Sequence, residues 1–243
     1  MLLPHDVFND IIKFSDMKTL LKLYGTNHTI HQLVLNHPFS KVLLKFKTNP
    51  YFNLDATSTL LNDFLNDLVG NDIEMLKRLQ TSFGACLIGK NISKQIIVLD
   101  GICNGKYTFR RLLQRLLGDL YVAGYLTANG NECKYYNDAY MVHFFDTSTW
   151  HTFNFKEKLK FLSDEPKFTT MITTDINNIQ DLNDVPYTKR LNIFKFKSIY
   201  VDQPHNINEK LRIPAMLRQL DHPSILSALL NFLLQGCREV LDH

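Results

Sequence analysis

The spacing of apolar side chains changes along the chain, and each change predicts a different element. Residues 57–87 repeat apolar positions at helical spacing, which predicts helical structure. Residues 96–99 form a short apolar run rich in β-branched side chains, the pattern of a buried strand. Helical spacing returns over residues 106–117 and ends at Gly118, a residue type that commonly follows a helix. The pattern therefore predicts a helical lead-in, a strand, a turn containing glycine and a second helix.

The second half of the chain again alternates between short apolar runs and polar stretches. Residues 139–145 and 168–172 predict two further buried strands, and residues 121–136 predict a loop with one short strand. Residues 155–162 predict a short basic helix. This alternation predicts an α/β fold with mainly parallel strands flanked by helices. A final helix is predicted from a broad apolar face formed by Ile225, Leu226, Leu229, Leu230, Leu233 and Leu234.

The first part of the chain predicts a separate, small all-α unit over residues 1–50, joined by turn-forming residues to a larger domain over residues 57–243. Its Leu-Pro-x-Asp-Val start resembles the F-box, a module that docks onto the adaptor subunit of cullin-type ubiquitin ligases. The same pattern also suits any small helical lead-in domain. The apolar positions that would anchor the unit are Leu3, Pro4, Val7, Ile11 and Leu20.

Composition narrows the classes of protein that remain. The chain has 243 residues, is 45% hydrophobic and 21% charged, and has a formal net charge of +3, which is too small to indicate a nucleic-acid partner. Its four cysteines are widely spaced and form no C-x-x-C pair, so we expect free thiols. Its nine histidines show no metal-site spacing. Without a secretory segment or a bilayer-length apolar run, we expect an intracellular protein that does not enter a membrane.

The turn between the predicted strand and helix carries candidate chemistry. Gly101, Asn104, Gly105 and Lys106 follow the layout of a P-loop, in which backbone amides, a helix N-terminus and a lysine hold phosphate. Two positions depart from that layout, because Asp100 replaces its first glycine and Tyr107 replaces its Mg²⁺-binding hydroxyl. Thr108 has a hydroxyl group, but it lies one residue after the position where the layout places it. The alternative is an ordinary β–α turn that needs glycine to reverse the chain.

The residues around this turn resemble a known family, the superfamily 3 helicase domain of primase-helicases from large DNA viruses, phages and plasmids, including the C-terminal part of poxvirus-type NTPases. The resemblance implies an AAA+-like P-loop NTPase sheet, ATP and Mg²⁺ as cofactors, a ring-shaped oligomer, and a role in DNA replication in the host cytoplasm or at a viral replication site. The matching positions are Phe64-Leu65, Gly70-Asn71-Asp72, Glu74, Leu79-Gln80, Gly84, Leu87, Gly101, Asn104-Gly105-Lys106, Thr108-Phe109 and Leu116-Leu117-Gly118-Asp119.

The resemblance also implies roles for residues further along the chain. Asp146, after a predicted strand, would be the Walker B acid that holds Mg²⁺ together with Thr108. Asp175 falls on the sensor asparagine, and Lys189-Arg190 falls on the pair that supplies an arginine finger. Asp146 and the Lys189-Arg190 pair have alternative readings, since many strands end in aspartate at a turn and a basic pair often marks a solvated strand entrance.

The family's basic pore hairpin has no counterpart in the short segment 147–167. Any DNA binding is therefore expected to be weak, salt-sensitive and non-specific, through phosphate contacts of arginines on the 106–117 helix and of Lys156, Lys158 and Lys160. The alternative is that these side chains only form solvated helix faces. Three readings remain. The chain is a helicase-like ATPase with weak or lost activity, an F-box-type adaptor built on a helicase domain, or an inactive paralogue that joins a helicase ring. The arginines of the 106–117 helix that could contact DNA phosphates are Arg110, Arg111 and Arg115.

Overall fold

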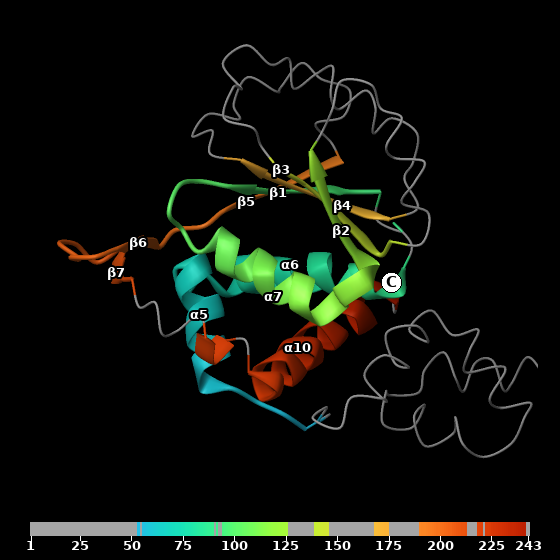
Figure 1. Cartoon of the computed structure of the whole chain (residues 1–243), viewed down its shortest axis with the longest axis horizontal. Helices are drawn as coiled ribbons and strands as arrows, with labels where there is room; N and C mark the ends of the chain where they lie inside the picture. Colours follow the sequence, from blue (N-terminus) through green and yellow to red (C-terminus); the bar gives the residue numbers. More distant parts are fainter. Residues whose placement is uncertain are drawn as a thin grey trace, which may run out of the picture.

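The computed structural model describes the chain from residue 53 onward, with gaps. The described residues are 53, 55–89, 91, 94–125, 139–145, 168–174, 190–212, 218–220 and 222–241. The predicted unit over residues 1–50 and the predicted basic helix over residues 155–162 lie outside them. The described residues form an α/β structure with a parallel sheet flanked by helices (Figure 1), as the sequence predicts.

The sheet has five strands, and every neighbouring pair is parallel. Their order is β2-β3-β4-β1-β5, so β4 lies between β1 and β3. In a parallel sheet all carboxyl ends meet at one edge, which is where such folds bind ligands. This is a Rossmann- or P-loop-like arrangement. The strands are β1 (Ile96–Asp100), β2 (Tyr121–Tyr125), β3 (Met141–Phe145), β4 (Thr169–Thr174) and β5 (Leu191–Lys195).

The strand β1 is enclosed on all sides, which explains its continuous apolar sequence. All five of its residues are buried, because β4 and β5 flank it and side chains cover both of its faces. Its last residue, Asp100, is level with Thr174 of β4 and Lys195 of β5. The chain segment that follows Asp100 therefore begins at the carboxyl edge of the sheet.

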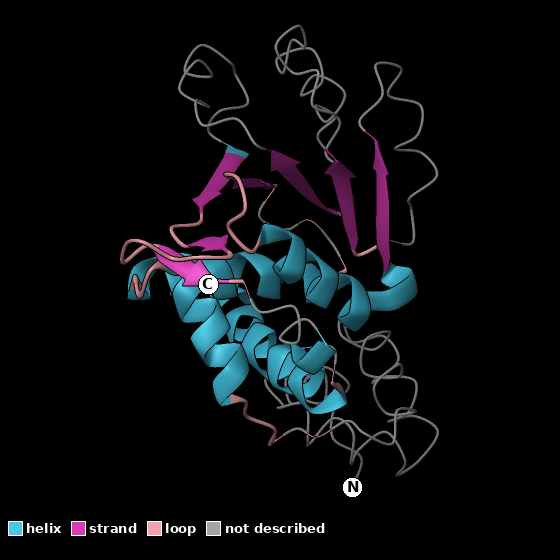
Figure 2. Cartoon of the chain, turned by 60° about the vertical axis from the view of Figure 1, so that its left-hand side comes forward, coloured by secondary structure: helices cyan, strands magenta, loops and turns pink. Residues whose placement is uncertain are grey.

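The helices α5 (Thr59–Val69), α6 (Ile73–Gly84), α7 (Lys106–Leu117) and α10 (Pro223–Leu241) all lie on the same side of the sheet (Figures 1 and 2). The predicted helical stretch over 57–87 is divided into α5, α6 and a 3-10 turn, η1 (Ala85–Ile88). Gly70 and Asn71 adopt positive φ and end α5, and the Asp72 carboxylate accepts a hydrogen bond from the Met75 amide and starts α6.

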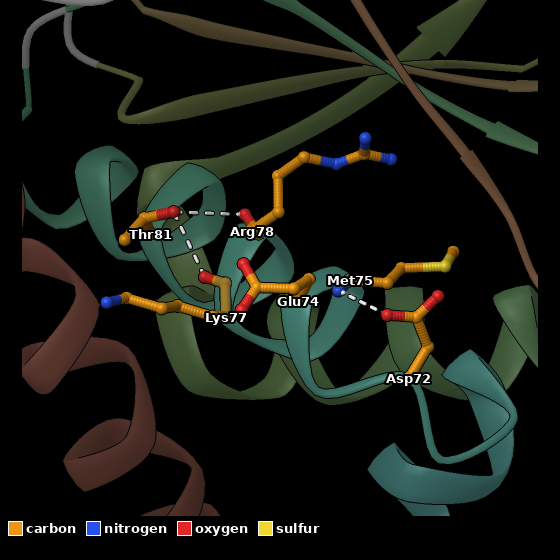
Figure 3. Close-up of a pocket in the computed structure, with 6 residues that line it drawn as sticks. All are labelled: Asp72, Glu74, Met75, Lys77, Arg78 and Thr81. Carbon is orange, nitrogen blue, oxygen red and sulfur yellow. Dashed lines mark hydrogen bonds between the residues drawn. The ribbon is translucent and has the colours of Figure 1, made fainter.

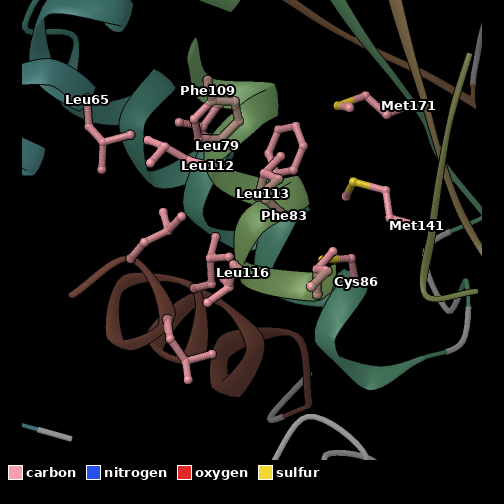
Figure 4. Close-up of a cluster of buried hydrophobic side chains, with 14 of the residues drawn as sticks. Leu65, Leu79, Phe83, Cys86, Phe109, Leu112, Leu113, Leu116, Met141 and Met171 are labelled. Atoms are coloured by element: carbon pink, nitrogen blue, oxygen red, sulfur yellow. The ribbon is translucent and has the colours of Figure 1, made fainter. Parts of the chain in front are cut away.

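The core lies between the sheet and these helices (Figure 4). The rings of Phe83 on α6 and Phe109 on α7 meet edge to face with 4.9 Å between their centroids. The methionines Met141 and Met171 close the core from the sheet. The predicted apolar faces of the 106–117 helix and of the C-terminal helix both contribute to this core. From α7 the contributors are Phe109, Leu112, Leu113, Leu116 and Leu117.

Two glycines let α6 and α10 approach each other closely. A Cβ atom on Gly84 would lie 2.4 Å from the Leu233 carbonyl oxygen, and one on Gly236 would lie 2.1 Å from the Gln80 carbonyl oxygen. The Gln80 side chain donates hydrogen bonds across the same contact to the Phe232 carbonyl (2.9 Å) and the Gln235 side chain (3.0 Å). The last helix is thereby fixed against the helical lead-in.

A small second sheet extends from the end of β5. Its strands, β6 (Ile199–Val201) and β7 (Glu209–Leu211), pair in parallel. Side chains tie this sheet to the end of α5, since Lys210 forms a 3.0 Å ion pair with Asp67 and the Ser198 hydroxyl donates to the Asp67 carbonyl. The sequence analysis predicts no such sheet.

Candidate functional site

The segment between β1 and α7, residues 101–105, is the strongest candidate for a functional site and is called the 101–105 loop below. It leaves the central part of the sheet at the carboxyl edge and leads directly into α7, a helix of 12 residues. A helix N-terminus carries partial positive charge and amides without intrahelical partners, so it favours anions.

The backbone of the 101–105 loop has the form of an anion-binding nest. Gly101, Cys103 and Gly105 have φ values of 112°, 52° and 85°, and they alternate with two residues whose φ is not positive. Such alternation turns successive N–H groups towards one concave side. Within the described residues, the amides of residues 102–105 have no hydrogen-bond acceptor. The loop thus offers several donors at one point.

Asn104 holds the loop in this conformation. Its side chain is 2% exposed, and its amide nitrogen donates to the Asp100 carbonyl at 2.7 Å. Its amide oxygen accepts from the Lys106 amide at 3.4 Å, a long hydrogen bond that closes the turn. The asparagine of the Asn-Gly-Lys tripeptide therefore has a structural role that the sequence pattern alone does not show.

Gly105 is required by both conformation and space. Its φ of 85° is unfavourable for other residues, and a Cβ atom there would lie 2.6 Å from Leu68 and 2.9 Å from the Tyr200 ring. The Tyr200 amide also donates to the Cys103 carbonyl at 2.7 Å. The loop is therefore supported from behind by α5 and β6, a contact between distant parts of the chain that local sequence patterns do not predict.

Lys106 reaches back over the loop from the first residue of α7. Its ammonium group donates to the carbonyls of Gly101 and Thr174, the second at 3.0 Å. The Thr174 carbonyl also accepts from the Gly101 amide at 3.2 Å, so the end of β4 is tied to the loop. A positive charge thus lies beside the amides of the nest, the combination that binds phosphate oxygens.

The residues after Lys106 do not reproduce the expected metal ligand. Tyr107 is 58% exposed, and the guanidinium carbon of Arg110 lies 4.7 Å from the centroid of its ring. Thr108 is partly buried one residue further along α7. The alternative that Arg110 only forms a solvated helix face is wrong, because only 9% of its surface is exposed. Its long apolar stem and its ring contact allow the charged group to turn inward.

A buried histidine, His143, lies on β3. His143 is fully buried, and its Nε2 lies 2.9 Å from the Thr173 hydroxyl of β4. Burial, and secondarily the charge of Arg110, lower the pKa of His143 from its ordinary value of 6.5 to about 3. The imidazole is therefore neutral throughout the physiological range, and its role here is to join β3 to β4.

This lowered pKa predicts a loss of stability in mild acid. The unfolded chain takes up a proton on His143 near pH 6.5, whereas the folded protein does so only near pH 3. Stability is therefore complete above pH 6.5 and falls as the pH falls towards 3, by about 2 kcal/mol at about pH 5. Urea denaturation of the wild type and of His143→Gln at pH 7 and pH 5 measures this loss. The prediction would be contradicted if the free energy of unfolding depended on pH in the same way in the wild type and in His143→Gln.

The other predicted site residues fall in two groups. Asp146, Asp175 and Lys189 lie outside the described residues. Arg190 is described and directly precedes β5, where its Nε donates to the Lys94 carbonyl at 2.7 Å. That position is at the amino edge of the sheet, opposite to the 101–105 loop of the same chain.

A groove of about 510 Å³ lies on α6 (Figure 3). Several of its polar groups are already used in structural contacts. Asp72 caps α6 and forms a 3.1 Å ion pair with Lys197, and both contacts lower the pKa of its carboxyl group. Arg78 donates to the Ile193 carbonyl of β5 at 2.8 Å and lies over the Phe194 ring. We therefore assign no binding role to this groove.

The sequence matches no protein-family model and no curated protein. In the part of the chain that the structure describes, no three His, Cys, Asp or Glu side chains are grouped so that they could hold a metal ion. None of the helices described combines the length and apolar character that a bilayer crossing needs. The 101–105 loop is therefore the feature of the described residues that points to a ligand.

Proposed function

We propose that the chain is a nucleoside triphosphate-binding protein related to superfamily 3 helicases, with weak or no ATPase activity. One observation carries the proposal: the 101–105 loop presents a nest of backbone amides, a helix N-terminus and the Lys106 ammonium at the carboxyl edge of a parallel sheet. An ordinary β–α turn needs a glycine to reverse the chain, but it needs neither alternating positive φ values nor a lysine folded back over the turn.

The order of strands supports the same assignment. The strand β4, which the family resemblance assigns to the sensor, lies between β1 and β3 and contacts the loop through Thr174. The carboxyl end of β4 therefore lies beside the proposed phosphate site. The lead-in helices α5 and α6 and the last helix α10 share one core with the P-loop helix α7, so the segments that carry the resemblance form one folded unit.

Weak hydrolysis follows from the first turn of α7. Catalysis of phosphoryl transfer depends on a metal ion that neutralises charge as it develops, whereas binding depends mainly on the amides and the lysine. Here the ring of Tyr107, covered by Arg110, takes the position of the metal-binding hydroxyl. The amides and Lys106 are retained, so we expect ATP to bind and to turn over slowly.

The test is titration of the full chain with a fluorescent ATP analogue, followed by measurement of phosphate release from ATP. We expect saturable binding and turnover well below that of working helicases, which is on the order of 1 to 10 per second. Turnover in that range would contradict the weak-ATPase part of the proposal. No binding of nucleotide would contradict the whole and would favour a purely structural or adaptor role.

A further inference from the structure

Arg110 places a buried positive charge in the first turns of α7, close to the proposed nucleotide site. Its guanidinium lies over the ring of Tyr107, the residue directly after Lys106, and its surface is 9% exposed. Because Arg110 follows Lys106 by four residues on α7, the two cations lie about one helical turn apart. Both positive charges belong to side chains of the protein itself.

The other side of Arg110 faces the sheet. Its charge acts on His143 of β3, where it adds to the effect of burial in lowering the pKa of the imidazole. It also acts on Tyr121 of β2, where burial raises the pKa of the phenol and the nearby guanidinium opposes that shift. With its contact to the Tyr107 ring, this puts the Arg110 charge on the side of α7 that faces the sheet.

In an ordinary P-loop site, a divalent cation lies between the start of this helix and the carboxyl end of the Walker B strand. Mg²⁺ is bound there by oxygen ligands, including a hydroxyl on the second residue of the helix. In this chain that residue is Tyr107, and its ring carries Arg110 on one face. A divalent ion placed beside a buried guanidinium would also be repelled by it, and more strongly than in water.

We propose that Arg110 supplies from within the protein the positive charge that a divalent cation supplies in ordinary P-loop sites, so that the 101–105 loop binds nucleoside triphosphate without Mg²⁺. The ligand is then the free nucleotide rather than its magnesium complex. This proposal rests on the proposed function and specifies its ligand. A guanidinium offers several fixed donors to phosphate oxygens, which suits it to this role.

The direct test compares two titrations of the full chain with the fluorescent ATP analogue, one in excess Mg²⁺ and one in EDTA. We expect dissociation constants that agree within about threefold. Binding that is more than about tenfold weaker in EDTA would overturn the metal-free proposal and leave the proposed function intact. Binding in neither condition would remove the proposed function, and this proposal with it.

Variants separate a charge effect from a packing effect. Arg110→Leu is expected to weaken binding in EDTA by at least about tenfold and to make the remaining binding depend on Mg²⁺. A purely structural role would instead weaken binding equally in both conditions. Arg115→Leu removes the same charge from an exposed position on the same helix and serves as the matched control, with both constants unchanged.

Tyr107→Ser provides a second test that leaves the core intact, because Tyr107 is 58% exposed. The variant restores a hydroxyl at the second position of α7 and removes the ring under Arg110. We expect Mg²⁺ to strengthen its binding of the analogue by about tenfold or more, a dependence that the wild type lacks. An unchanged response to Mg²⁺ would overturn the proposal even if Arg110→Leu does not fold.

Discussion

Lys106→Ala is expected to weaken binding of nucleoside triphosphate by roughly 10- to 150-fold, the loss that corresponds to removing a charged hydrogen-bond donor from a phosphate group. The ammonium group lies over the nest, where it donates to the carbonyls of Gly101 and Thr174. A phosphate group placed against the loop amides would be within reach of the same donor. Titration with the fluorescent ATP analogue measures the loss.

Two controls make this result specific to the site. Arg115→Ala also removes one positive charge from α7, but from an exposed position in its last turn, and is expected to leave the affinity unchanged. A thermal melt of Lys106→Ala shows whether the variant keeps its fold after losing the hydrogen bonds to the Gly101 and Thr174 carbonyls. Equal affinities for the wild type and a folded Lys106→Ala would contradict the assignment of the loop to phosphate.

Gly236→Ala is expected to lower the free energy of unfolding by about 1 to 3 kcal/mol, as overpacking of a core does. Helix propensity alone predicts the opposite sign, since alanine is about 1 kcal/mol better than glycine within a helix. The close approach decides the outcome, because the new Cβ atom would lie 2.1 Å from the Gln80 carbonyl oxygen, a rigid backbone atom. Urea denaturation measures the difference.

Arg238, an exposed residue of α10 two positions after Gly236, provides the control. Arg238→Ala changes helix propensity only slightly and at an exposed position, so its stability is expected to stay within about 0.5 kcal/mol of the wild type. A Gly236→Ala variant more stable than the wild type would show that α6 and α10 are further apart than described.

Local features of the chain were predictable because local physics determines them. The run of β-branched residues before Gly101 predicts β1, and the spacing from Phe109 to Leu117 predicts α7 and its buried face. Gly118 ends α7 as its position in the sequence indicates. Each of these predictions depends on side chains within a few residues of one another, and the structure confirms each.

Contacts between distant segments were not predictable from these patterns. The position of β4 between β1 and β3 depends on pairing across the sheet, which no local period encodes. The support of the loop by Tyr200 arises in the same way. The burial of Arg110 was not predictable in the same way, because a charged side chain usually indicates exposure to solvent. Its apolar stem packs in the protein, and its guanidinium lies over the Tyr107 ring. The predicted roles of Asp146, Asp175 and Lys189 remain predictions, since these residues lie outside the described part of the chain.

The carbonyl of Thr174 accepts hydrogen bonds from both the Gly101 amide and the Lys106 ammonium. A phosphate group that draws Lys106 to itself takes that second donor away from the last residue of β4. Occupancy of the loop by phosphate would therefore change the hydrogen bonding at the carboxyl end of a neighbouring strand, immediately before Asp175 in the sequence. The Thr174 carbonyl is the point at which β4 would register a ligand on the loop.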